Sequence, residues 1–432
     1  TPCGTLFPYT TLFRSLEARG PLSGLGDIVA IHSGADGSQR SLAEVVGFRD
    51  SRLLLMPMHG LNGIACGDRV TPLDGGFAIP VGPQLLGRVV DGFGRPLDGG
   101  PPITAESTWT VHREAPPSML RSRIREPFHT GLRAIDAPLP CGRGQRMGIF
   151  SGSGVGKSTL LGMIARHAQS EVNVIGLIGE RGKEVREFIE DSLGPEGLAR
   201  SVVVVVTSDK PALQRVRGGE VTMAIAEYFR EQGRDVCLVM DSITRFAMAQ
   251  REIGLAIGEP PTSKGYPPSV FGLLPRLLER AGNSRQGSIT AFITVLVEGD
   301  DLNDPIADTV RSILDGHIVL SRELAMQGHY PAIDVLASVS RVMNSVGSDE
   351  HIACARELGE LLANYKNAED LINIGAYQEG SNPDIDRAIA KRDEVRAFLQ
   401  QGLDEHEAWE GTYSRLREIV QSPAATGEPG PS

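Results

Sequence analysis

The residues best suited to chemistry in this sequence lie in one glycine-rich segment, Phe150–Thr159, which reads Phe-Ser-Gly-Ser-Gly-Val-Gly-Lys-Ser-Thr. Glycines let the backbone turn so that several N–H groups point inward around phosphate oxygens. An apolar, strand-like run precedes the segment and a helical pattern follows it, and helix N-termini favour anions. The segment is therefore predicted to be a phosphate-binding loop (P-loop) for ATP or GTP. Ser151 is its one departure, because the general motif has glycine there.

Two side chains at the end of the P-loop are expected to act directly on the ligand. Lys157 is a compact positive charge that can bridge the β- and γ-phosphates, and Ser158 can supply a hydroxyl to Mg²⁺. The residues predicted to bind nucleotide along this loop are Gly152, Ser153, Gly154, Val155, Gly156, Lys157, Ser158 and Thr159.

A carboxylate that holds the metal is expected at the end of a neighbouring strand. The run Asp235–Asp241 has an apolar interior and ends in Asp241. From that position Asp241 can hold Mg²⁺ through the water shell of the ion. The alternative is a strand-end aspartate that caps the next helix. The intact P-loop favours the metal ligand.

Hydrolysis also requires a group that orients and polarises water. Glu180 follows the apolar run Val174–Gly179, so it is expected to project from the carboxyl end of a strand. Ligands bind at that edge in open α/β sheets. Arg181 lies beside it in the sequence, and the alternative for Glu180 is a surface ion pair with Lys183.

Two further residues remain ambiguous from the residues alone. Arg341 lies in Leu336–Met343, where a structural salt bridge is the default interpretation of an arginine. Tyr330 lies in Gly-His-Tyr-Pro, where it could be a plain core aromatic residue.

Composition and charge narrow the class of protein. A chain of 432 residues can form two or three domains. Its formal net charge of −11 argues against a general nucleic-acid-binding protein. No apolar run reaches the ~18 residues of a membrane span, and Thr1–Ser15 lacks the features of a signal peptide. The cysteines are widely spaced without a CxxC pair, which predicts reduced thiols in a cytosolic protein.

The N-terminal part of the chain is expected to be β-structure. Residues 21–85 contain short apolar alternations, such as Asp27–Ile31 and Ala43–Phe48, separated by glycine-rich turn signals. This pattern predicts a small β-barrel or sandwich. Residues 1–20 differ in character from the rest and are predicted to be a non-native or disordered leader outside the fold.

Residues 86–345 are expected to form an α/β domain. Apolar strand-like runs alternate there with helical patterns, which predicts a parallel sheet covered on both faces. The predicted strands are Met147–Phe150, Val172–Ile178, Val202–Thr207, Val236–Met240, Ile289–Val297 and His317–Leu320. Residues 346–420 are polar and helical and are predicted to form a C-terminal helical domain, and residues 421–432 are predicted to be disordered.

Four segments beyond the P-loop resemble a known family. Gly179–Val185 reads Gly-Glu-Arg-Gly-Lys-Glu-Val and is similar to the catalytic-glutamate motif of the rotary ATPases and type III export ATPases. Met240–Glu259, Gly265–Phe271 and His329–Met343 match the same superfamily. The resemblance covers about residues 22 to 420. It is nearest to the flagellar export ATPases, with the injectisome (virulence) ATPases very near.

The resemblance implies a homohexameric ring that hydrolyses ATP with Mg²⁺ to energise type III protein export. Each subunit would have a β-barrel, a RecA-like P-loop ATPase core with a parallel sheet, and a C-terminal helical domain. The implied partners are a central stalk protein, a negative regulator, export substrates with their chaperones, and the membrane export gate, without nucleic acid. The implied location is the cytoplasm, peripherally at the inner face of the cell membrane.

The resemblance also implies roles for individual residues. Glu180 would act on the attacking water and Asp241 on the metal. Tyr330 would stack on the adenine of its own subunit, and Arg341 would reach into the neighbour's site as an arginine finger, which makes catalysis depend on assembly. Two more arginines would lie near the phosphates, Arg181 and Arg245. The acidic loop Glu298–Asp304 resembles a pore-facing loop and would contact the stalk, with a solvated charged loop as the alternative.

Other functions are also compatible with a P-loop. A regulatory subunit that binds nucleotide without hydrolysis would lack the carboxylate that Glu180 supplies. The catalytic subunit of a rotary ATP synthase is disfavoured by the Pro/Gly-rich stretch Glu259–Phe271 and by the absence of a long insertion before the P-loop. A hexameric RNA motor is disfavoured by the acidic charge and the lack of an aromatic, basic groove. Flagellar and injectisome export stay open, because both share the ATPase motifs.

Overall fold

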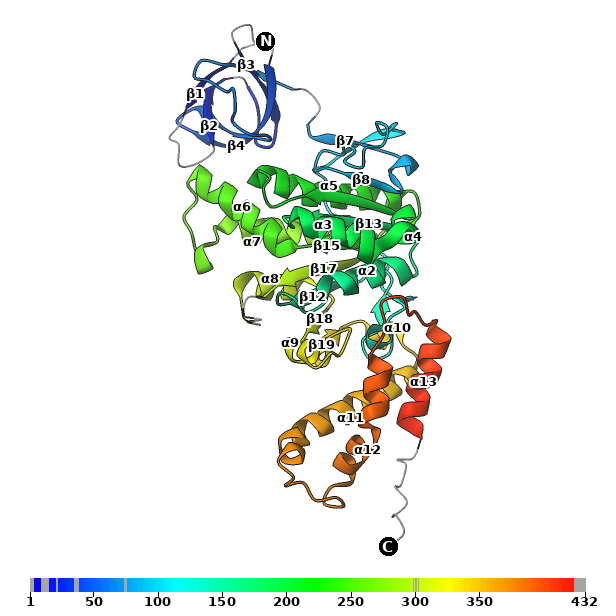
Figure 1. Cartoon of the computed structure of the whole chain (residues 1–432). Helices are drawn as coiled ribbons and strands as arrows, with labels where there is room; N and C mark the ends of the chain where they lie inside the picture. The colour runs from blue at the N-terminus through cyan, green and yellow to red at the C-terminus, as the bar shows by residue number, and fades with distance from the viewer. Residues whose placement is uncertain are drawn as a thin grey trace.

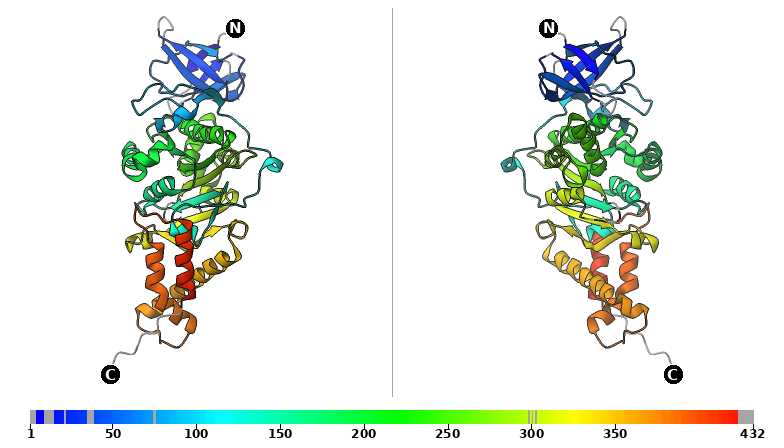
Figure 2. Two further views of the ribbon diagram at one scale, coloured as in Figure 1. Left: turned by 90° about the vertical axis from the view of Figure 1, so that its right-hand side faces the viewer. Right: turned by 90° about the vertical axis from the view of Figure 1, so that its left-hand side faces the viewer.

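The computed structural model describes residues 4–8, 15–20, 22–34, 39–73, 76–297, 299, 301 and 303–422. A β-barrel forms one end of the molecule, an α/β part forms the middle, and a group of helices forms the other end (Figure 1). Figure 2 shows the same order from the two perpendicular sides.

The N-terminal barrel is closed and has the strand order β1-β2-β5-β4-β3-β6. Its strands are β1 (Gly4–Pro8), β2 (Leu16–Arg19), β3 (Ile28–Ser33), β4 (Gln39–Arg49), β5 (Arg52–Pro57) and β6 (Arg69–Pro72). Alternate residues of a strand face the same side. Val29 and Ile31 of β3 and Ala43 and Val45 of β4 therefore meet in one apolar core inside the barrel.

The structure corrects the expectation that residues 1–20 lie outside the fold. Strands β1 and β2 pair with each other, and β2 pairs with β5 through Leu16 and Leu55. Leu16 and Ala18 are buried, and Glu17 accepts a hydrogen bond from Arg52 at 2.9 Å. These strands satisfy backbone groups that an open edge of β5 would leave unpaired. Residues 1–3 and 9–14 lie outside the described residues.

The barrel also ends earlier than residue 85, the predicted boundary. Strand β7 (Ala78–Val81) pairs with β9 (Ser107–Thr110) rather than with a barrel strand. Ile79 and Val81 are buried in the apolar core that includes Val204 and Tyr228 of the α/β part. Residues from β7 onward therefore pack with the central domain.

The central sheet has nine strands, with the order β19-β18-β12-β17-β15-β13-β14-β8 and with β16 beside β17. All pairs are parallel except β16–β17 and β18–β19. The strands are β8 (Arg88–Val90), β12 (Arg146–Ser151), β13 (Val172–Ile178), β14 (Ser201–Val206), β15 (Asp235–Asp241), β16 (Gly282–Asn283), β17 (Ser288–Leu296), β18 (Gly316–Leu320) and β19 (Ile333–Ser340). A short separate pair consists of β10 (Pro127–Phe128) and β11 (Cys141–Gly142).

Helices cover both faces of this sheet, as Figure 1 shows. The helices between the barrel and the C-terminal end of the molecule are α1 (Arg133–Asp136), α2 (Lys157–His167), α3 (Gly182–Glu187), α4 (Gly194–Ala199), α5 (Ala212–Glu231), α6 (Ile243–Ile257), α7 (Pro268–Leu278), α8 (Pro305–Ile313), α9 (Arg322–Met326) and α10 (Met343–Val346). Val202 and Val204 of β14 pack in one core with α5 and α6, whereas Val203 and Val205 pack in a second core with α2. The near-continuous apolar runs of the sequence follow from this two-sided burial.

Three longer helices form the C-terminal end of the molecule, namely α11 (Asp349–Asn373), α12 (Pro383–Leu399) and α13 (Trp409–Gln421). Ser348 and Asn382 cap α11 and α12 by accepting hydrogen bonds from backbone N–H groups of the first turn. Of the tail predicted to be disordered, residues 423–432 lie outside the described residues. Within the described ranges, no helix has the length and apolar character needed to cross a membrane.

Candidate active site

The P-loop connects the end of β12 to the start of α2, the strand–loop–helix context that the sequence predicted. Gly154 and Gly156 have φ angles of +78° and +86°, in the left-handed region that favours glycine. Gly154, Ser158 and Thr159 are exposed, so the loop and the first turn of α2 are open to a ligand. The positive end of the helix dipole therefore faces the space in which phosphates would bind.

The position of Ser151 explains why a serine is tolerated where the general motif has glycine. It is the last residue of β12, so its backbone is extended and does not require glycine. Its side chain is fully buried, and its hydroxyl has no hydrogen-bond partner among the described residues. Ser151 is therefore a small, buried packing residue at the end of β12, next to the P-loop.

Three charged side chains from separate segments meet at the carboxyl edge of the sheet. The Lys157 ammonium contacts both carboxylate oxygens of Asp241, and it lies 3.9 Å from Oε1 of Glu180. Asp241 ends β15 and Glu180 lies two residues beyond β13, its neighbour in the sheet. The parallel register therefore brings together the lysine, the glutamate and the aspartate that the sequence singled out.

Asp241 is a buried carboxylate that the core holds in place. It is 3% exposed, and the hydroxyl of Thr294 in β17 donates to its Oδ1 at 2.8 Å. It does not cap the next helix, because the Ser242 hydroxyl accepts the hydrogen bond from the backbone N–H of Arg245 at 3.3 Å. The helix-cap alternative is therefore wrong. Thr294 was missed in the sequence, where it is one polar residue inside an apolar run.

Glu180 is buried, with 6% of its surface exposed, and Arg245 Nε donates to its Oε1 at 3.1 Å. Burial, a hydrogen bond with Glu184 and the charge of Asp241 raise the pKa of Glu180 to about 7, against the opposing charges of Lys157 and Arg245. A carboxyl group with this pKa can exchange a proton near neutral pH. The surface-pair alternative is wrong, since Lys183 pairs with Glu187 at 3.3 Å.

Glu184 is a second carboxyl group at this site, and nothing in its local sequence distinguishes it from the other charged residues of α3. The hydrogen bond with Glu180 lowers the pKa of Glu184, so that the proton of the pair resides on Glu180. Arg181 Nη1 donates to Oε1 of Glu184 at 3.0 Å, and the Arg181 side chain is otherwise exposed. Arg181 is thus linked to Glu180 through Glu184.

Tyr330 lies beside the P-loop and is not a core aromatic residue. Its side chain is in the loop between α9 and β19 and is 46% exposed. A Cβ atom placed on Gly156 would lie 3.2 Å from Cε1 of the ring. The ring therefore borders the open side of the P-loop.

Arg341 lies at the opposite edge of the sheet, the amino edge, where the parallel strands begin. It follows β19, whose last residue, Ser340, pairs with Gly316 at the start of β18. Its backbone N–H donates to Asp315 O at 3.0 Å, and its guanidinium donates to Arg311 O at 3.3 Å. The side chain is exposed and forms no ion pair within the described part of the chain. The structural-salt-bridge alternative is therefore not supported.

The residues of the site fit a bound Mg²⁺ ion. Asp241 and the exposed hydroxyl of Ser158 offer the oxygen ligands that Mg²⁺ prefers, and this ion commonly takes its other ligands from phosphate and water. The Lys157 ammonium contacts the Asp241 carboxylate in this structure. When nucleotide binds, Lys157 can pair with phosphate and leave Asp241 available to the metal ion.

Fold and site together define a P-loop ATPase with a barrel on its N-terminal side. Residues 131–340 match the family model described as the nucleotide-binding domain of the ATP synthase alpha/beta family. Residues 347–418 match the C-terminal domain of the T3SS EscN ATPase.

Individual relatives extend the match over nearly the whole chain. The flagellum-specific ATP synthase of Bacillus subtilis is 52% identical over 405 residues, 94% of this chain and 92% of that protein. The type 3 secretion system ATPase of Xanthomonas euvesicatoria is also 52% identical, over 94% of this chain and 91% of that protein. The structure of the assembled ATPase EscN from enteropathogenic E. coli has a TM-score of 0.90 at 46% identity, covering 96% of this chain and 100% of that one. The chain belongs to the family of flagellum-specific ATP synthases and type 3 secretion system ATPases, and it is an ATPase.

Proposed function

We propose that this chain hydrolyses Mg²⁺-bound ATP to energise type III protein export, in the flagellar apparatus. The observation that carries the proposal is the position of Glu180. It is buried 3.9 Å from Lys157, beside Asp241, and its pKa of about 7 suits proton transfer. A protein that only binds nucleotide would not require a buried carboxyl group at this place.

In the proposed reaction, each group at the carboxyl edge has one task. The P-loop N–H groups and Lys157 bind the phosphates, and Ser158 and Asp241 hold Mg²⁺. When bound, the ion neutralises charge on the transferred phosphoryl group. The Glu180 carboxylate orients the attacking water and accepts its proton, and Arg245, 3.1 Å from Glu180, fixes that carboxylate.

The central test is Glu180→Gln, which keeps the shape of the side chain and removes its ability to accept a proton. ATP binding should stay within about threefold of the original, while turnover falls by about 10²–10⁴-fold. Glu187→Gln is the matched control, because Glu187 is an exposed carboxylate that pairs with Lys183 one turn further along α3. Turnover of the Glu180 variant within a few-fold of the original would refute the assigned role.

Two further residues are proposed to act on the nucleotide, one on the base in its own subunit and one on the phosphates in the neighbouring subunit. Tyr330 stacks on adenine, since its exposed ring borders the P-loop at Gly156. Arg341 acts as an arginine finger in the site of the adjacent subunit of a homohexamer, which its exposed position at the far sheet edge permits. Arg181 lies near the phosphates at the mouth of the site. Turnover per subunit should therefore rise with protein concentration as rings form, and a flat dependence down to a verified monomer would refute the finger.

The flagellar role is favoured by relatives in several bacteria. The flagellum-specific ATP synthases of Salmonella typhimurium and Pseudomonas aeruginosa are 54% and 53% identical to this chain. Injectisome export is the second candidate, because type 3 secretion system ATPases reach 52%. Expression in a Bacillus subtilis strain without its own relative would distinguish the two. Restored swimming would support the flagellar role. A chain that is stably produced and does not restore swimming would contradict it.

A central stalk protein is the partner with the most direct support. EscN has been solved in complex with its central stalk EscO, and that EscN chain has a TM-score of 0.88 to this one. The proposed contact is the acidic loop, where Lys264 Nζ lies 3.4 Å from Asp301 and 3.5 Å from Asp304. Asp300 lies outside the described residues. Replacing Asp301 with Asn should weaken stimulation of turnover by a stalk protein, and unchanged stimulation would contradict the contact.

The remaining proposed partners follow from membership in an export system. They are a negative regulator, export substrates with their chaperones, and the membrane export gate, without nucleic acid. The proposed location is cytoplasmic and peripheral to the inner face of the cell membrane. Stimulation of turnover by RNA would contradict the exclusion of nucleic acid.

A further inference from the structure

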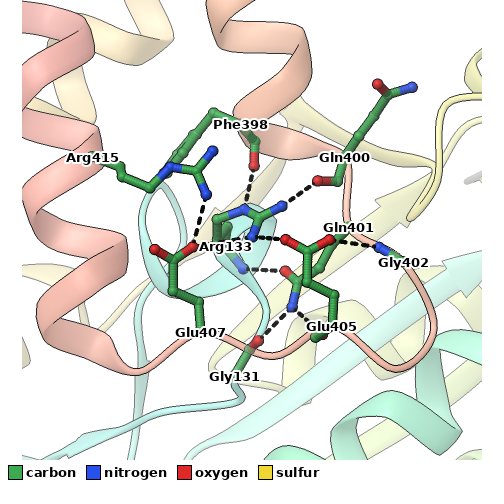
Figure 3. A network of polar contacts seen from close by, with 9 residues as sticks. All are labelled: Gly131, Arg133, Phe398, Gln400, Gln401, Gly402, Glu405, Glu407 and Arg415. Carbon is green, nitrogen blue, oxygen red and sulfur yellow. Dashed lines mark hydrogen bonds and ion pairs between the residues drawn. The ribbon is translucent and has the colours of Figure 1, made fainter.

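The segment between α12 and α13, residues 400–408, leaves the helical end of the molecule and lies against the α/β domain. Gln401 is its most enclosed side chain, with 5% exposed. Its Oε1 accepts from Arg133 N at 3.0 Å, and its Nε2 donates to Gly131 O at 2.8 Å and to Glu405 O at 2.7 Å (Figure 3). One amide thus joins the loop before α1 to the segment after α12.

Arg133 also holds the same segment through its own side chain. Its guanidinium is 3% exposed and contacts the backbone oxygens of Phe398 and Gln400 and the carboxylates of Glu405 and Glu407 (Figure 3). A buried charge is costly unless its hydrogen bonds are satisfied. The segment is therefore held in one position relative to the α/β domain.

The held segment also supports the loop that carries Tyr330. The backbone N–H of Gln401 donates to Tyr330 O at 2.9 Å. Arg396 and Gln400 donate to the two preceding turn oxygens, Gln327 O at 3.2 Å and Gly328 O at 3.4 Å. The backbone of this loop is thus fixed by the end of α12, while the Tyr330 ring is free to meet a ligand.

We infer that Gln401 is a positioning residue for the nucleotide base. Its side-chain hydrogen bonds to Gly131, Arg133 and Glu405 fix the backbone that keeps the Tyr330 ring at the P-loop. The inference rests on the proposed role of Tyr330 in stacking. A Cβ atom placed on Gly156 would lie 3.2 Å from the Tyr330 ring, and 46% of the residue's surface is exposed, so burial alone does not fix the ring beside the P-loop. Its position depends on the backbone bond from Gln401, and that backbone depends on the Gln401 side chain.

The test replaces Gln401 with Met in the full chain, which keeps side-chain length and removes all three side-chain hydrogen bonds. Calorimetry with Mg²⁺ should show the Kd for ATP rising by about 3- to 10-fold, because part of the base stacking is lost. The Kd for inorganic tripolyphosphate, which has no base, should change by less than about twofold. In kinetics, KM should rise and kcat should stay within about twofold.

Asp404→Asn is the matched control in the same segment. Asp404 is 88% exposed and pairs with Arg166 at 2.9 Å, without contact to the Tyr330 loop. Binding of both ATP and tripolyphosphate should be unchanged in this variant. Should Gln401→Met fail to fold, Gln401→Glu, which keeps the acceptor for Arg133 N–H and loses the donors, is measured with the same expectations.

A Tyr330→Ala background separates this inference from the function proposed above. If Tyr330→Ala weakens ATP and spares tripolyphosphate, stacking stands, and Gln401→Met should then add no further loss. Unchanged ATP binding in Gln401→Met alone, or equal weakening of ATP and tripolyphosphate, would overturn the positioning role while stacking stands. Unchanged ATP binding in Tyr330→Ala would instead refute the stacking role and with it this inference.

Discussion

The two edges of the central sheet differ in whether their charged side chains find partners within the same chain. At the carboxyl edge, Glu180 and Asp241 are buried, and Lys157 lies within ion-pair distance of both carboxylates. At the amino edge, Arg341 is exposed, and its guanidinium has one backbone oxygen, that of Arg311, as its partner among the described residues. The comparison indicates that the groups proposed to act on phosphate, metal and water lie together within one chain, whereas the exposed Arg341 guanidinium forms no ion pair among the described residues and is proposed to act on a second chain.

The largest expected effect comes from removing the guanidinium at the amino edge. Arg341→Ala should lower turnover by about 10³–10⁵-fold, because the finger stabilises charge in the transition state. ATP binding to the isolated subunit should be unchanged, since Arg341 lies away from its own P-loop. Steady-state kinetics and calorimetry measure the two quantities.

Arg311→Ala is the control for that prediction. Arg311 lies on α8 at the same edge, and its guanidinium pairs with Asp308 at 2.9 Å. Its loss should change turnover by less than about threefold, as is usual for exposed pairs. Similar losses in both variants would show that the edge needs positive charge in general and would contradict a specific finger.

A smaller effect is expected from Asp241, the proposed metal ligand at the carboxyl edge. Asp241→Asn removes the negative charge that would hold Mg²⁺, so turnover should fall by about 10²-fold and more Mg²⁺ should be required for half-maximal rate. Kinetics over a range of Mg²⁺ concentrations measure both. An unchanged Mg²⁺ requirement would remove Asp241 from the metal site.

The sequence alone predicted most of the carboxyl edge. Lys157 belongs to a local motif, and Glu180 and Asp241 follow long apolar runs that the structure confirms as β13 and β15. In these cases the information lies within about ten consecutive residues, which is the range over which periodicity can be observed.

The features that the sequence did not predict depend on contacts between distant segments. The Gln401 and Arg133 pair is separated by 268 positions, and Thr294 reaches Asp241 across 53. Strand β8 is only three residues long, and most residues of β19 are partly buried or exposed, so neither strand is a continuous apolar run in the sequence. The barrel strands before residue 20 were missed because β2 pairs with β5 and β1 pairs with β6, both distant in the sequence.

The smallest expected effect is a pH dependence of stability at the carboxyl edge. The pKa of Glu180 is about 7 in the folded protein, above the ordinary glutamate value, so the folded state binds this proton more tightly than the unfolded state. As pH rises from about 5 to 8, the original protein should lose on the order of 2–3 kcal/mol of unfolding free energy relative to Glu180→Gln. Denaturant unfolding without nucleotide measures the difference.

Glu184→Gln serves as the comparison of opposite sign. The pKa of Glu184 is lowered, so its contribution to stability is present above the ordinary glutamate pKa and is lost as pH falls through the folded value. Relative to this variant, the original protein should therefore gain stability as pH rises through the acidic range. A pH-independent difference for Glu180→Gln would show that burial does not hold the proton on Glu180.

Mixing two inactive variants tests most directly the claim that the site is complete only between two chains. Glu180→Gln subunits keep the arginine, and Arg341→Ala subunits keep the carboxylate. In rings formed randomly from equal amounts of the two variants, about a quarter of the interfaces would have both groups intact. Turnover of the mixture should therefore rise well above that of either variant alone, toward about a quarter of the original rate. A mixture that assembles yet stays as inactive as its components would contradict the account.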